Sequence, residues 1–129
     1  MKKGINLWDL QYLESADSSS EYAKNIMKAG GDPNCMQEGE TLYESVIWRL
    51  RERVPDNYEY LCQFAQLLLA YGGKAPNYGY QWEFADPEFD ISDLKSFDDY
   101  QLYFRESENK YCREGVIVDR KSRKEIAHL

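Results

Sequence analysis

Apolar residues recur at the spacing of an amphipathic helix through the first half of the chain. Four helices are expected: a short one whose face holds Ile5, Trp8 and Tyr12, one from about Ser18 to Gly30, and two over residues 41–53 and 58–71. Near the start of each of the last three, a polar residue precedes glutamate by three positions. This capping-box spacing lets two side chains satisfy free main-chain N–H groups. The pairs are Ser18–Glu21, Thr41–Glu44 and Asp56–Glu59.

Two of these helices are expected to end in the same way, in IMKAGGDPN (residues 26–34) and LLLAYGGKAPN (residues 67–77). A glycine just past a helix can take the left-handed conformation that ties up the last carbonyls, and proline cannot continue the helix. We therefore expect Gly30 and Gly72 each to lie just past the second helix of a pair. The recurrence predicts a repeated helix-turn-helix unit.

The order of these pieces resembles the ankyrin repeat family. Gly39-Glu40-Thr41 stands where that family has its G-x-T start, and Leu67–Gly73 followed by Pro76-Asn77 stands at its repeat end. The chain departs from the pattern at Leu42-Tyr43-Glu44, where the family has Pro-Leu-His. Its repeat of about 42 residues is also longer than the usual 33 or so. The resemblance covers residues 5–78 and implies a protein-binding module without catalysis.

Residues 81–129 are rich in aromatic and β-branched residues, which favours strands. Residues 116–118 and 126–129 flank a polar link and predict a hairpin, to which Gln101–Phe104 adds a third antiparallel strand. Two repeats bury too little surface to stand alone, so the sheet should cap the last helix pair. The expected fold is a single α+β domain over residues 1–129, mainly helical. It has two ankyrin-like helix pairs within residues 5–78, and an acidic, aromatic segment with a small antiparallel sheet over residues 79–129.

Charge is unevenly distributed along the chain, whose net charge is −7. Residues 83–108 hold nine acidic and two basic residues, so this fifth of the chain alone accounts for the whole net charge. Such a balance argues against direct binding of nucleic acid. The aromatic residues in this segment either face inward while the acids are solvated, or form with the acids a surface for a cationic partner. The second interpretation selects, as partner-binding residues, Asp90, Asp93, Asp98, Asp99 and Tyr100.

Candidate chemistry is sparse. The three cysteines lack a CxxC pair, which predicts reduced thiols in a cytoplasmic protein. The single histidine, His128, is expected at the surface on a terminal strand, and no motif for a cofactor or a metal is present.

No apolar run approaches the ~20 residues that span a bilayer. Asp9 and Glu14 interrupt the apolar core that a signal peptide would need.

Together these features predict a non-enzymatic protein-binding module. The specific hypothesis is a small cytoplasmic inhibitor or immunity protein that neutralises a basic partner, such as the nuclease domain of a toxin. The alternative is a carboxylate-based hydrolase or metal-dependent enzyme. That alternative needs at least two of the 23 acidic residues to converge in a cleft.

Overall fold

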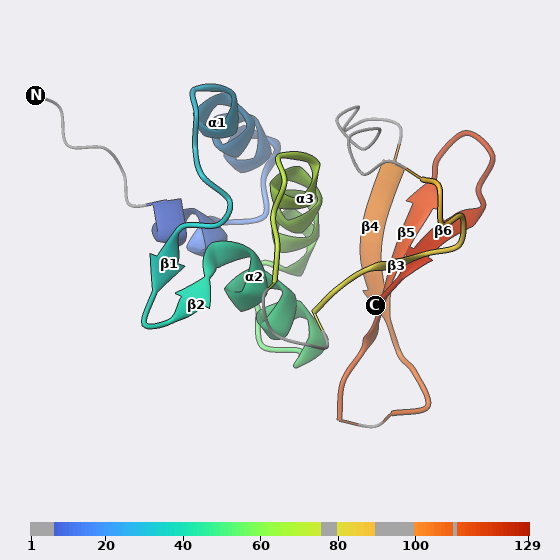
Figure 1. The fold of residues 1–129 in the computed structure, drawn as a ribbon. Helices are drawn as coiled ribbons and strands as arrows, with labels where there is room; N and C mark the ends of the chain where they lie inside the picture. Colours follow the sequence, from blue (N-terminus) through green and yellow to red (C-terminus); the bar gives the residue numbers. More distant parts are fainter. Residues whose placement is uncertain (1–6, 76–79, 90–99, 110) are drawn as a thin grey trace, which may run out of the picture.

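The computed structural model describes residues 7–75, 80–89, 100–109 and 111–129. Helices and a short hairpin come first: η1 (Leu7–Tyr12, a 3₁₀ helix), α1 (Asp17–Lys28), β1 (Met36–Gln37), β2 (Glu40–Thr41), α2 (Leu42–Arg51) and α3 (Tyr58–Ala70). A four-stranded sheet follows: β3 (Glu83–Phe84), β4 (Tyr100–Arg105), β5 (Glu114–Asp119) and β6 (Glu125–His128). Its strands are antiparallel in the order β3-β6-β5-β4. The helices lie to one side of this sheet, with α3 next to β4 (Figure 1).

The prediction of a mainly helical fold is wrong. Of the described residues, 38% are helical and 20% lie in strands, so the chain is α+β with a substantial sheet. Two features raise the strand content relative to the helix content that was expected. The first expected helix is only a six-residue 3₁₀ helix, η1, and the sheet contains a fourth strand, β3, beyond the three that the sequence placed in it. No helix in the described ranges has the length and apolar character needed to cross a membrane.

Only one of the three expected capping boxes forms. The Thr41 hydroxyl accepts the Glu44 N–H at 3.1 Å, and the Glu44 carboxylate accepts the Thr41 N–H at 3.2 Å. Helix α1 begins too early for the first box, because Ala16 is its N-cap. At α3 the N-cap is Asn57, whose amide donates to the carbonyls of Gln11 and Leu13 in the η1 region. These bonds do not cap the helix, because Asn57 is the donor in both; the Tyr60 N–H in the first turn instead donates to the Ser15 hydroxyl at 3.2 Å.

Both Gly-Gly endings are confirmed as helix stops. Gly30 and Gly72 have φ values of +107° and +93°, and each helix closes with the paired hydrogen bonds of a Schellman motif. Gly73, the second glycine of the later pair, is required for a different reason, the lack of space for a side chain. A Cβ on Gly73 would lie 2.9 Å from the Leu68 carbonyl oxygen and 3.0 Å from the Tyr43 ring, whereas one on Gly72 would meet nothing within 4 Å. The first glycine therefore supplies conformation, and the second supplies space.

The predicted C-terminal strands are confirmed. Strands β5 and β6 form the hairpin, and β4 pairs with β5 so that Leu102 lies opposite Ile117. The link between β5 and β6 is an exposed turn that carries four basic residues: Arg120, Lys121, Arg123 and Lys124. The hydrophobic core is shared by helices and sheet, which explains why the two parts pack together. Its fully buried large side chains include Leu10, Met27, Tyr43, Ile47, Phe64, Leu68 and Ile117.

Helix α3 also bonds directly to the outer edge of β4. The Gln66 amide accepts the Leu102 N–H at 3.0 Å and donates to the Tyr100 carbonyl. Further along, the Tyr58 hydroxyl bonds the main chain of Phe104. This edge of the sheet is therefore closed by side chains.

Candidate functional site

Four of the five predicted site residues, Asp90, Asp93, Asp98 and Asp99, lie outside the described residues. The fifth, Tyr100, is the first residue of β4 and is half-buried. Its ring packs edge-on against Phe89 at 6.3 Å between centroids, and Phe89 stacks on Phe84 at 4.9 Å. We call these three side chains the aromatic row. Tyr100 is thus one member of a packed set of aromatic side chains.

Three exposed carboxylates lie beside the aromatic row: Glu83, Asp86 and Glu88. None of them forms an ion pair with a cation in the described ranges. The nearby Arg105 does not neutralise them, because its guanidinium is held by Glu114 at 3.0 Å and by Glu125 at 3.1 Å. Those two bonds raise the pKa of Arg105 above its ordinary value. The three carboxylates therefore carry no direct ion pair within the described residues, but the basic turn of residues 120–124 lies at the same end of the sheet, since Tyr100 pairs with Asp119 and Ala85 bonds to Ile126.

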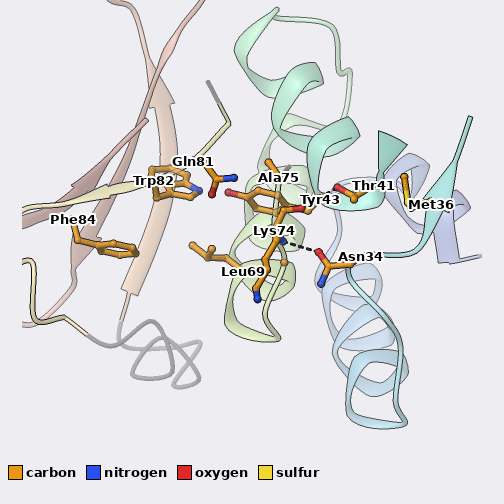
Figure 2. Close-up of a pocket in the computed structure, with 11 residues that line it drawn as sticks. Asn34, Met36, Thr41, Tyr43, Leu69, Lys74, Ala75, Gln81, Trp82 and Phe84 are labelled. Atoms are coloured by element: carbon orange, nitrogen blue, oxygen red, sulfur yellow. Dashed lines mark hydrogen bonds between the residues drawn. The ribbon is translucent and has the colours of Figure 1, made fainter. Parts of the chain in front are cut away.

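A groove of about 680 Å³ runs between the helical part and the sheet. Figure 2 shows Trp82 and Phe84, from strand β3 and its approach, pointing toward Tyr43 and Leu69 on the helices. We call it the Trp82 groove; its other lining residues are Asn34, Met36, Thr41, Gly73, Lys74, Ala75 and Gln81. Sequence reasoning missed this groove because its walls come from separate stretches of chain that only folding brings together.

The groove contains a buried polar group, the indole N–H of Trp82. This N–H is inaccessible to solvent and faces the Tyr43 hydroxyl, whose pKa it lowers as a hydrogen-bond donor (Figure 2). The Tyr43 hydroxyl itself donates to the Tyr80 carbonyl at 3.5 Å. Burial raises the pKa of Tyr43 far above its ordinary value, and the Trp82 indole only partly opposes this, so the phenol is neutral. The groove therefore has mainly apolar walls, and its indole donor is buried against Tyr43.

The cysteines and the histidine are the remaining side chains to which chemistry could be assigned. The three cysteines are free, and burial raises the pKa of Cys62 to about 12, so it is a neutral thiol at pH 7. His128 lies at the surface on β6, as predicted, and its ring bonds to Glu125 at 2.7 Å. Among the described residues, no three or more His, Cys, Asp or Glu side chains are grouped as a metal site would require.

The chain was compared with protein-family models, with curated proteins and with solved structures, and none of the three comparisons finds a match.

Proposed function

We propose that the protein is a non-enzymatic binding module that acts in the cytoplasm on a basic protein partner. In its specific form, the proposal is an inhibitor or immunity protein that neutralises a partner such as a toxin nuclease domain. The resemblance of residues 5–78 to ankyrin repeats supports the same class, since that family binds proteins. The acidic balance of the chain supports a cationic partner.

One observation carries the proposal: exposed carboxylates without counter-ions stand beside a row of aromatic rings. Glu83, Asp86 and Glu88 can steer a cationic surface during diffusion, because they are exposed and none of them is ion-paired with a described cation. The aromatic row then offers contact area of the kind that dominates binding energy at interfaces. The carboxylates would thus speed the association with the partner, and the aromatic rings would stabilise the complex once it has formed.

The test begins by capturing the partner with the tagged protein from the cells that make it, and by determining the partner's charge. Association and dissociation rates are then measured at low and high salt for the parent and for the variant Glu83→Gln/Asp86→Asn/Glu88→Gln. A second variant replaces Asp90, Asp93, Asp98 and Asp99 by asparagine, which tests the residues selected from the sequence. The matched control neutralises three exposed carboxylates in η1, in α1 and between them, Asp9, Glu14 and Glu21.

We expect the first two variants to associate about tenfold more slowly at low salt, with a flatter salt dependence and nearly unchanged dissociation. The association rate of the control variant should fall much less, because its charges lie away from the proposed contact. The proposal would be refuted by a partner that is acidic, or by an equal fall in the association rate of all three variants.

A further inference from the structure

Two exposed surfaces of opposite charge lie at the same end of the four-stranded sheet. One is the basic turn of residues 120–124, which links β5 to β6 and carries four exposed cations. Figure 1 shows this turn at the end of the sheet where β4 begins, in accord with the pairing of Tyr100 with Asp119. The chain leaves β3 at the same end, because the Ala85 N–H donates to the Ile126 carbonyl in β6 at 2.9 Å.

The second surface follows directly, since Asp86 and Glu88 are exposed in the segment after β3. Strand β6 lies between β3 and β5. Neighbouring strands are about 5 Å apart, so this segment starts about 10 Å from the strand that enters the basic turn. A protein contact of ordinary size covers about 800 Å² of each partner, a patch about 30 Å across. A partner that lies on the carboxylates therefore also meets the basic turn.

Hydrogen bonds fix the main chain of both surfaces. The Asp119 carboxylate accepts the Lys121 N–H at 2.9 Å, and the Asp119 N–H donates to the Lys124 carbonyl, also at 2.9 Å. In the segment after β3, the Asp86 carboxylate accepts the Glu88 N–H at 2.9 Å. The basic turn therefore cannot fold away from a partner without breaking these bonds, and the two surfaces keep their relative positions.

We propose that the partner carries both signs of charge where it touches this protein: a basic patch on the carboxylates and, beside it, an acidic patch on the basic turn. This inference rests on the proposed function. A uniformly basic surface would bring cations against the four cations of the turn, and like charges in a contact cost binding energy. A surface with both patches gains at both places, and the two signs fix the orientation in which it docks. The basic turn thus rejects basic proteins that lack the acidic patch.

The probe is a blocked peptide of four lysines and four glutamates separated by three prolines, which hold the two blocks about 9 Å apart. Control peptides contain the lysine block alone or the glutamate block alone. Binding to ¹⁵N-labelled protein is followed through the amide signals of Glu88 and Ser122, at about 20 mM salt so that charges are little screened. The turn variant is Arg120→Gln/Lys121→Gln/Arg123→Gln/Lys124→Gln. The control variant is Lys24→Gln/Lys28→Gln on α1, which lies on the other side of α3 from the sheet (Figure 1).

We expect the two-block peptide to move both signals and to bind at least about tenfold more tightly than either control peptide, because its second contact forms within one complex. The lysine peptide should move the Glu88 signal, and the glutamate peptide should move the Ser122 signal. The turn variant should lose the tenfold gain of the two-block peptide, whereas the control variant should keep it.

The captured partner then gives a test in which the two possibilities have opposite signs. At about 150 mM salt, where charges act over about 8 Å, the turn variant should associate about three- to tenfold more slowly than the parent. The control variant, which also makes the chain more negative, should associate like the parent. Unchanged or faster association of the turn variant would overturn the inference, as would a two-block peptide that binds no better than the lysine peptide. The proposed function survives those results if Glu83→Gln/Asp86→Asn/Glu88→Gln still slows association, and it fails if that variant associates at the parent rate.

Discussion

The hydroxyl of Tyr58 makes two hydrogen bonds to the main chain of a single residue, Phe104. It accepts the Phe104 N–H and donates to the Phe104 carbonyl, each at 2.8 Å. A neighbouring strand would supply the same two bonds through its own main chain. The Gln66 amide likewise bonds the main chain of Tyr100 and Leu102. Side chains of helix α3 therefore make the hydrogen bonds that a fifth strand would make at the β4 edge. These bonds fix the sheet to the helical part in one register.

Tyr58→Phe should destabilise the protein by about 1–3 kcal/mol, because it leaves a donor and an acceptor of the nearly buried Phe104 without partners. The contact of the ring with the Arg113 guanidinium can persist in the variant, so the change isolates the hydroxyl. Urea denaturation gives the free energy of unfolding. The control is Tyr71→Phe at the end of α3, where the ring is 41% exposed and the stability should change by less than about 0.5 kcal/mol. Equal effects at the two positions would contradict the bonding role of Tyr58.

Alkaline pH should weaken the fold through the same tyrosine. Burial, the largest cause, raises the pKa of Tyr58 from 10.0 to about 12 and that of Cys62 from 9.0 to about 12. An acid whose pKa is raised by folding keeps its proton longer in the folded state. Its contribution is therefore complete below the unfolded pKa and is lost as pH rises toward the folded one. We expect the free energy of unfolding to fall between pH 9 and 12, and to fall less steeply in Tyr58→Phe. A curve of the same slope in both proteins would show that Tyr58 is not responsible.

The helices and their ends could be predicted because the information is local. An apolar period defines α2 and α3, and a Gly-Gly pair needs only the preceding turn to act as a stop. The features that the sequence did not predict have a common cause. The Asp56–Glu59 box does not form, and the Tyr60 N–H bonds instead to the distant Ser15 hydroxyl. Gln66 bonds to β4, which is 36 positions away at Leu102. Side chains that bond across the fold leave no periodic pattern in the sequence.

The candidate site was predicted only in part for the same reason. Uneven charge is visible in composition, so the acidic character of residues 83–108 needed no structure. The Trp82 groove could not be found in this way. Trp82 and Tyr43 are 39 positions apart in the sequence, and the short strand β3 has too few residues to show an alternating pattern.

The two glycines that end α3 should respond differently to alanine. Gly72→Ala should cost on the order of 1 kcal/mol, because φ is +93° while the new Cβ has open space. Gly72→Asn should cost less, since asparagine tolerates left-handed geometry better. Gly73→Ala should cost more than Gly72→Ala, because its Cβ would press on the Leu68 carbonyl and the Tyr43 ring. Thermal denaturation of the three variants checks this order; the reverse order would mean that conformation and space have been assigned to the wrong glycines.

Asn34 links the two Gly-Gly endings, and its removal should loosen the second one specifically. Its amide donates to the Gly72 carbonyl at 3.0 Å and accepts the Lys74 N–H at 2.7 Å. Asn34→Ala deletes both bonds, so the Lys74 amide hydrogen should exchange with solvent at least about tenfold faster, with an overall loss of about 1–2 kcal/mol. The control is Asn25→Ala, an exposed position on α1 where alanine favours the helix and the exchange of Lys74 should not change. If Lys74 exchanges at the parent rate in Asn34→Ala, other contacts hold this segment. In that case the wall of the Trp82 groove formed by residues 73–75 does not depend on the first ending.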